Sequence, residues 1–100
     1  MEAFTFFHQQ EIKQFMILEI LTPEKKLYSG DVLGVQLPGI SGSFEVLDKH
    51  APMVSALGNG QLKVLKDKSN NSRFSIKSGF VEVLNNKVTV LVEGAEALDA

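Results

Sequence analysis

The stretch FVEVLNNKVTVL, residues 80–91, sets two runs of β-forming residues on either side of a pair of asparagines. Asparagine tolerates the positive φ angles of a two-residue type I′ turn, so the stretch predicts a β-hairpin. That turn fixes the register, which places the four valines on one face and the polar Glu82 and Thr89 on the other. The expected pairs are Leu84 with Lys87, Val83 with Val88, Glu82 with Thr89, Val81 with Val90, and Phe80 with Leu91.

Similar short runs of Val, Ile, Leu and Phe recur along the chain, separated by Gly, Pro, Asn, Asp and Ser at intervals typical of a sandwich or barrel. We therefore expect an all-β fold, a two-sheet β-sandwich (flattened barrel) of about 8–10 short, mostly antiparallel strands. In the N-terminal half, the expected strands are residues 15–21, buried on both faces, and residues 25–29 and 32–37, which are divided by Gly30-Asp31. Two more strands are expected over 62–66 and 73–77, joined by a mobile polar connection over 67–72. The side chains expected to point inward from these two strands are Leu62, Val64, Phe74 and Ile76.

The length of 100 residues and the net charge of −2 suit one domain. A chain of this size buries roughly 65% of its surface on folding, which is enough for a core without disulfides. The expected organisation is an N-terminal extension over residues 1–14, either a short helix, disorder or an artefact of the start site; a sandwich over 15–96; and a short tail over 97–100.

Composition excludes several classes of protein. The chain has no cysteine, which removes disulfide frameworks and thiolate zinc sites. The near-neutral charge argues against nucleic acid as a partner. No run approaches the length of a membrane-spanning helix, and residues 1–14 lack the pattern of a secretion signal.

Chemical motifs are sparse. Asp48 and His50 are of the residue types that a hydrolytic triad requires, but the sequence gives no evidence that they are arranged as one. His8 and His50 alone are a weak metal site. Residues 39–43 (GISGS) lack the lysine of a phosphate-binding loop, and their glycines fit a tight turn instead. We therefore expect no catalytic residue, no cofactor, no metal ligand and no bound small molecule.

Two other functions stay open. Asp48-Lys49 is similar to the lysine-bearing hairpin of lipoyl or biotinyl carrier domains, although the following His50-Ala51-Pro52 departs from that pattern. A small β-sandwich could also bind a soluble ligand.

A series of segments decides between these readings. In order they are LEILTPE (18–24), LYSG (27–30), LPG (37–39), GSFEVL (42–47), HAPM (50–53), SGFVEV (78–83) and KVTVL (87–91). The series resembles the N-terminal β-sandwich of the epsilon subunit of F-type ATP synthase, over about residues 16–96. Each segment alone is weak, but the order and spacing together are specific.

The resemblance implies a non-catalytic subunit of the central stalk that couples rotation of the gamma subunit to the membrane c ring. It implies a peripheral place on the cytoplasmic face of a bacterial inner membrane. By the same likeness the contacts to the c ring are Gly39, Ile40, Ser41, Gly42, Ser43 and Phe44, and the contacts to gamma are His50, Pro52, Met53 and Ser55. Without an interface, Ile40 and Phe44 would be ordinary turn and core residues, and His50 would brace its own backbone.

The sequence departs from that family at both ends. Members commonly continue into a two-helix C-terminal hairpin that restrains ATP hydrolysis, whereas this sequence ends at Ala100, where such a helix would begin near Ala95–Leu98. We expect the inhibitory helices to be missing. Members also begin close to the position of Met16, so either Met16 is the natural start or residues 1–15 are an added arm.

Overall fold

The computed structural model describes residues 15–98, and within that range every regular element is a β-strand. This confirms the predicted all-β class; the predictions for residues 1–14 and for 99–100 lie outside the described residues. The eight strands are β1 (Met16–Leu21), β2 (Lys26–Val32), β3 (Gly34–Gly39), β4 (Gly42–Leu47), β5 (Met53–Leu57), β6 (Gly60–Leu65), β7 (Asn71–Leu84) and β8 (Lys87–Leu98).

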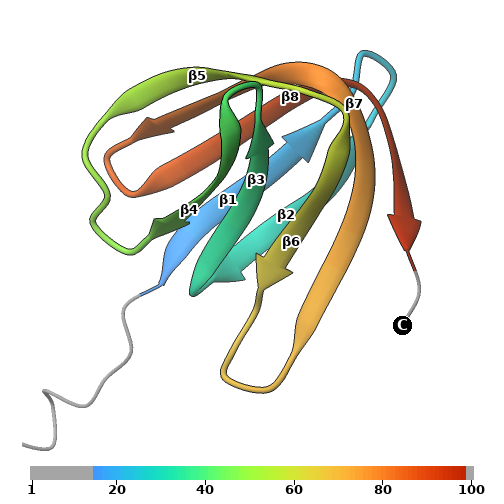
Figure 1. Ribbon diagram of the computed structural model, residues 1–100. Coiled ribbons are helices and arrows are strands. Elements are labelled where there is room, and N and C mark those ends of the chain that lie inside the picture. The colour runs from blue at the N-terminus through green and yellow to red at the C-terminus, as the bar shows by residue number, and fades with distance from the viewer. Residues whose placement is uncertain (1–14, 99–100) are drawn as a thin grey trace, which may run out of the picture.

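The strands form one hydrogen-bonded path in the order β2-β1-β8-β7-β5-β3-β4, and β6 pairs with both β3 and β7. β1 and β8 are parallel, and the other pairs are antiparallel. The first half of β7 pairs with β6 and its second half with β5, so this long strand joins the two layers of the sandwich. Figure 1 shows β7 bending across the top of the molecule to make this link.

The β7–β8 hairpin has the predicted register. All five expected pairs occur, from Leu84 with Lys87 to Phe80 with Leu91. Asn85 and Asn86 have φ angles of 52° and 63°, as a type I′ turn requires. The turn chemistry of two residues therefore sets the alignment of the two longest strands.

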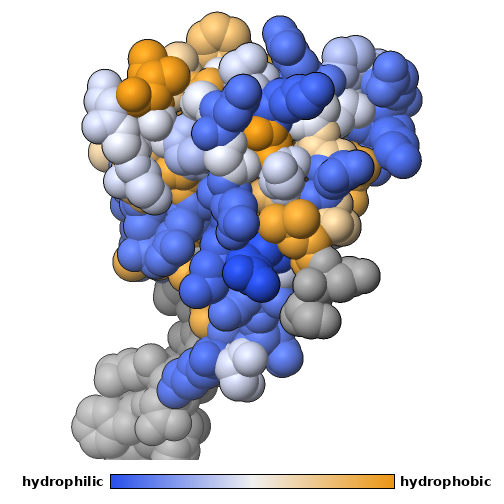
Figure 2. All heavy atoms as spheres, turned by 45° about the vertical axis from the view of Figure 1, so that its right-hand side comes forward, coloured by the Kyte–Doolittle hydropathy of each residue, from blue (hydrophilic) through white to orange (hydrophobic). Residues whose placement is uncertain are grey.

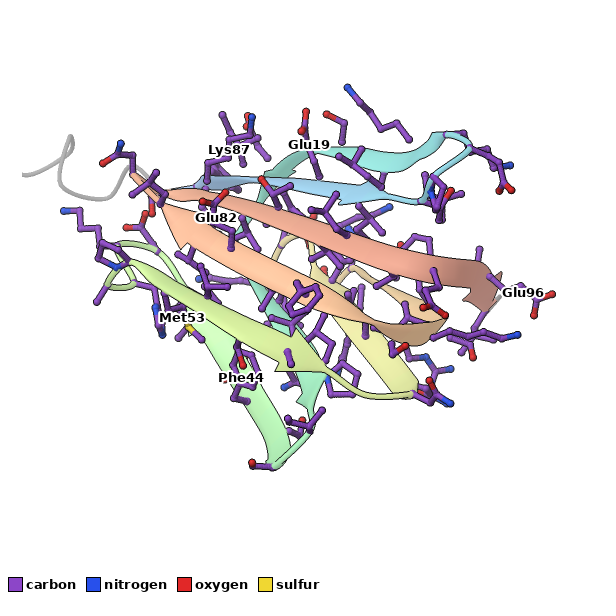
Figure 3. The ribbon with its side chains drawn as sticks, turned by 90° about the horizontal axis from the view of Figure 1, so that it is seen from above. Glu19, Phe44, Met53, Glu82, Lys87 and Glu96 are labelled. Atoms are coloured by element: carbon purple, nitrogen blue, oxygen red, sulfur yellow. The ribbon has the colours of Figure 1, made fainter. Side chains whose placement is uncertain are left out.

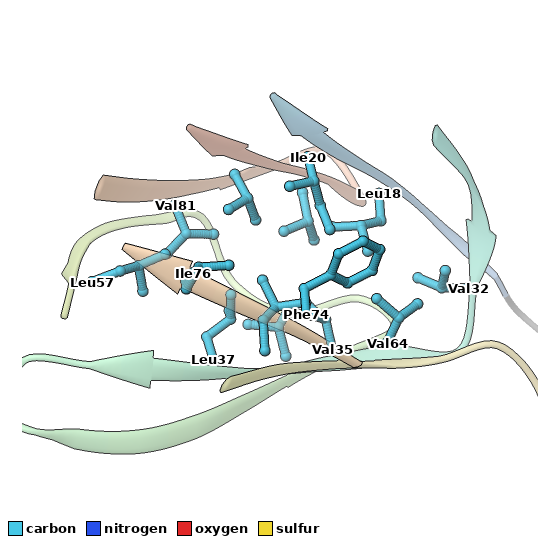
Figure 4. Close-up of a cluster of buried hydrophobic side chains, with 14 of the residues drawn as sticks. Leu18, Ile20, Val32, Val35, Leu37, Leu57, Val64, Phe74, Ile76 and Val81 are labelled. Atoms are coloured by element: carbon cyan, nitrogen blue, oxygen red, sulfur yellow. The ribbon is translucent and has the colours of Figure 1, made fainter. Parts of the chain in front are cut away.

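The space between the layers is filled by hydrophobic side chains, to which every strand contributes at least one (Figure 4). The inward positions predicted for β6 and β7 are confirmed, since Leu62, Val64, Phe74 and Ile76 are all buried. No polar or charged side chain is buried among residues 15–98. A core of this kind is close-packed and has low compressibility.

Two predicted features of the first strands need correction. β1 is buried on one face only, because its outward Ile17 is 46% exposed. The break between the second and third strands falls at Leu33 and not at Gly30-Asp31, which are part of β2 and pair with β1. Pairing with a neighbouring strand supplies the backbone hydrogen bonds there, so the turn-forming residues do not interrupt the strand.

The later strands are longer than predicted. β7 runs without a break from Asn71 to Leu84, and β8 continues to Leu98. Ala95–Leu98 are therefore strand and not the start of a helix, because their ladder with β7 outweighs the helix preference of alanine and glutamate.

The connection before β7 is ordered by Asp67, whose carboxylate accepts hydrogen bonds from the Ser69 and Asn70 amides at 2.9 and 2.8 Å.

Hydrophilic residues dominate the face shown in Figure 2, and the hydrophobic residues there form small separate patches. Within residues 15–98 the structure contains no helix suited by length and hydrophobicity to cross a membrane.

Candidate subunit interface

The β3–β4 hairpin carries the residues predicted to meet the c ring. Gly39 pairs with Gly42, which leaves Ile40 and Ser41 as the tip. Gly42 has a φ of 133°, a conformation that residues with a side chain rarely adopt. The hairpin thereby turns tightly and presents Ile40, which is 71% exposed, at its end.

Within this first group the six residues differ in exposure. Ser41 and Ser43 are exposed, whereas Phe44 is half-buried and packs against the core. The hairpin is also attached to the strand β5, since the Ile40 amide donates to the Ala56 carbonyl at 3.4 Å and the Gly58 amide donates to the Pro38 carbonyl at 2.8 Å. The tip therefore has a fixed position relative to the sandwich.

The residues predicted to meet gamma surround the connection from β4 to β5. The His50 amide donates to the Leu47 carbonyl at 3.1 Å, which closes a turn. The His50 ring nitrogen Nδ1 lies 2.8 Å from the Ala51 carbonyl oxygen, so the imidazole also braces its own backbone. Pro52 is exposed, and Met53 is half-buried against the core.

The two groups lie at opposite ends of β4. The hairpin tip precedes the strand and the His50 turn follows it, so at about 3.3 Å per residue they are separated by roughly 17 Å. Ser55, on β5, lies along the return between them and is half-buried. Figure 3 shows Phe44 and Met53 on the side of the molecule formed by β4 and β5. The predicted residues thus form two patches and not one site.

The residues considered for a metal site or a hydrolytic triad are not brought together within residues 15–98. No three His, Cys, Asp or Glu side chains within residues 15–98 are grouped for a metal ion. The Asp48 carboxylate accepts a hydrogen bond from the Asn86 amide and the His50 ring contacts its neighbouring carbonyl, so no triad geometry is seen. Burial, and secondarily the charge of Asp31, raise the pKa of Tyr28 above its ordinary value.

An apolar groove of about 470 Å³, not predicted from the sequence, lies on the outer face of β1, β5, β7 and β8. Cross-strand neighbours Leu21, Leu91, Phe80 and Ala56 form a row along its floor. Phe80 and Leu91 are 58% and 50% exposed. The signal was present in the sequence, because the predicted hairpin register already puts this pair on the outward face.

Comparison with known proteins identifies the family. The sequence profile of the ATP synthase delta/epsilon chain, beta-sandwich domain, matches residues 15–98. The chain belongs to this family. A relative in Salinibacter ruber, named ATP synthase epsilon chain, is 43% identical over 89 residues, and one of the same name in Chlorobium limicola is 44% identical over 77 residues.

The chain does not span all of these relatives. The match covers 81% of this chain and 60% of the Salinibacter ruber protein, and 76% of this chain and 86% of the Chlorobium limicola protein. The chain thus spans about three fifths of the length of the Salinibacter ruber relative.

Solved structures show the same fold. A chain in the Euglena gracilis mitochondrial ATP synthase structure of OSCP/F1/c-ring superposes with a TM-score of 0.80 and 22% identity, covering 88% of this chain and 58% of that one. A chain of the Tetrahymena thermophila ATP synthase central stalk/c-ring gives 0.71 and 23%, covering 84% and 67%. At these identities the likeness establishes the β-sandwich alone.

Proposed function

We propose that this chain is a non-catalytic subunit of the central stalk of ATP synthase and couples rotation of the gamma subunit to the membrane c ring. Membership of the delta/epsilon family and relatives named ATP synthase epsilon chain support the proposal. The observation that carries it is the position of the two candidate patches at opposite ends of β4. A domain with two separate contact surfaces can join two partners.

The construction of the sandwich suits a mechanical role. β4 pairs with β3 along its whole length, from Gly34 with Leu47 to Gly39 with Gly42. Behind this pair lies a core in which no described polar side chain is buried. A close-packed interior deforms little under force, so a load applied at one end of β4 reaches the other end. Residues 39–44 would contact the c ring, and His50, Pro52, Met53 and Ser55 would contact gamma.

The proposed role needs no helical element. The described residues are strands and their connections, and the two patches belong to the strands β3, β4 and β5 and the turns between them. In this proposal the described sandwich exerts no restraint on ATP hydrolysis. The protein would lie peripherally on the cytoplasmic face of a bacterial inner membrane, held there by its partners, and would need no cofactor.

The decisive experiment is co-purification. A tagged copy of the full chain, expressed in the source organism and purified from mild-detergent extracts of its membranes, should bring down gamma and c subunits in fixed proportion. Recovery of neither partner would refute the proposal. Intact mass of the same sample separates the carrier alternative, because an adduct on the exposed Lys49 would indicate a carrier domain. Saturable binding of a soluble ligand by the isolated chain would favour the ligand-binding alternative.

Substitution of Ser43 by tryptophan tests the c-ring patch. Ser43 is exposed at the base of the hairpin opposite Pro38, so Ser43→Trp should leave the melting temperature nearly unchanged. The bulky ring should obstruct the contact and weaken assembly about fivefold, which corresponds to about 1 kcal/mol. Titration of the variant into complexes stripped of this subunit measures the effect. Unfolding of the variant, with normal assembly of the surviving fraction, would show that the hairpin is structural only.

A further inference from the structure

The side chain of Asn86, in the β7–β8 turn, forms hydrogen bonds with two segments that are distant in sequence. Its side-chain Oδ1 accepts a hydrogen bond from the Lys49 amide at 2.7 Å. Its Nδ2 donates to Asp48 Oδ1 at 2.7 Å and to the Phe15 carbonyl at 3.2 Å. Its backbone carbonyl accepts from the Ile17 amide at 3.1 Å. One side chain thereby connects the β7–β8 turn to the β4–β5 connection and to the entrance of β1.

The turn that Asn86 contacts has an unusual backbone. It is closed by the Leu47–His50 hydrogen bond, and of its two central residues only Lys49 has positive φ, at 66°. Positive φ at the third position is the pattern of a type II turn, where glycine or asparagine is the usual residue. A lysine there is strained, because its Cβ crowds the backbone.

Two alternative turns are available to these four residues. Types I and II differ by rotation of the central peptide, which here joins Asp48 to Lys49, and the rotation reverses the direction of the Lys49 N–H. A lysine by itself favours type I, in which its φ is negative. The Asn86 Oδ1 accepts a hydrogen bond from that same N–H, so the bond is available only while the peptide keeps its type II orientation.

We infer that Asn86 is a positioning residue that selects the type II form of the Leu47–His50 turn and thereby presents His50 in the orientation that binds gamma. The inference rests on the proposed function for its second half, since binding of gamma gives the turn its purpose. Its first half concerns this chain alone. Asp48, the residue before the peptide bond that would rotate, supports the same arrangement, because its carboxylate accepts a hydrogen bond from the Asn86 side-chain amide.

The test separates the turn from the fold. Asn86→Gly removes the side chain, yet glycine keeps the positive φ that the hairpin needs at this position. Lys49→Gly, added to it, removes the strain, so type II can form without the clamp. Asn85→Gly is the matched control, because Asn85 has the same positive φ in the same turn and no side-chain hydrogen bond within the described residues.

Two readouts are measured on the full chain for each variant. The first is the nuclear Overhauser effect between Asp48 Hα and the amide proton at position 49, which is strong in type II and weak in type I turns. The second is the affinity for purified gamma subunit of the same organism. Asn86→Gly should weaken the proton contact and lower the affinity about tenfold, or 1.4 kcal/mol, because only the fraction of chains with the type II turn is competent to bind. The double variant should recover both, and Asn85→Gly should change neither.

Each contrary result has a distinct meaning. A strong proton contact in Asn86→Gly would overturn the inference, and so would a double variant that recovers the contact but not the affinity. Failure of the unsubstituted chain to bind gamma would refute the proposed function instead. In that case the proton contact alone decides whether Asn86 selects the turn.

Discussion

Substitution of Gly79 by alanine should strongly destabilise this domain. Gly79 lies in β7 between Leu57 of β5 and Val92 of β8, at the point where β7 exchanges β6 for β5 as its partner. A Cβ at this position would overlap the Leu91 carbonyl oxygen and lie 2.7 Å from the Val92 Cα. Both atoms belong to the backbone of the adjacent strand, so no side-chain rotation can relieve the contact.

The loss of stability expected for Gly79→Ala arises because the backbone of β8 would have to move away from β7. Forced overpacking destabilises proteins by about 1–3 kcal/mol, and a clash with backbone belongs at the upper end, about 3 kcal/mol. For a domain of this size that loss lowers the melting temperature by about 12–24 °C. Thermal and urea denaturation, followed by circular dichroism, measure it. The slope of the free energy against urea should stay the same if the native state keeps its compactness.

Gly94→Ala is the matched control for this prediction. Gly94 belongs to the same pair of strands and lies opposite Lys77, but an added Cβ would have the Lys77 side chain, at 3.8 Å, as its nearest contact. We expect a change within about 1 kcal/mol, with a small gain where the unfolded chain loses freedom. Equal losses in the two variants would show that glycine matters in this ladder for flexibility and not for the close approach at Gly79.

The sequence could predict those structural features that are determined by residues close together in the chain. The β7–β8 register follows from Asn85-Asn86 and from alternation within twelve residues, and the structure confirms it pair by pair. The ends of β2 and β8 depend on pairing with other strands, and for that reason the break at Gly30-Asp31 was predicted wrongly and the extension of β8 through Ala95–Leu98 was not predicted. Pairing with a neighbouring strand outweighs local turn and helix preferences.

The candidate interface also combines features that the local sequence predicts with features that depend on contacts between distant segments. The segments that carry the predicted contacts could be read from the sequence. The structure places most of these residues in turns and at strand ends, and Phe44 and Ser55 within β4 and β5. Their separation into two patches required the path of β4. The bonds of Asn86 to Lys49 and Phe15 span 37 and 71 residues of sequence, and no local pattern predicts such contacts. The groove on the outer face is intermediate, because the register predicted its central pair but not its neighbours on β1 and β5.

Substitution of Ile40 by asparagine should produce the largest loss of binding among surface changes. Ile40 is the exposed hydrophobic residue at the hairpin tip, and its side chain is not part of the core. If this tip contacts the c ring, the isoleucine is its apolar anchor, and loss of such an anchor costs about 2 kcal/mol or more. That cost corresponds to roughly 30-fold weaker binding of the chain to complexes stripped of it. ATP-driven proton pumping by the reassembled complexes should fall in parallel.

Val54→Asn distinguishes a contact from a general effect of surface polarity. Val54 is also 71% exposed and β-branched, and it lies outside the predicted c-ring patch. It stands between Met53 and Ser55 on β5, but its side chain faces the opposite side of the strand from theirs. Each substitution replaces an exposed hydrophobic side chain by the same amide, so both variants should fold with nearly unchanged melting temperatures. Only Ile40→Asn should lose binding and pumping. If the two variants bind alike, the hairpin tip does not contact the c ring, and the force-transmitting surface must be sought elsewhere, first along the apolar groove that includes Phe80 and Leu91.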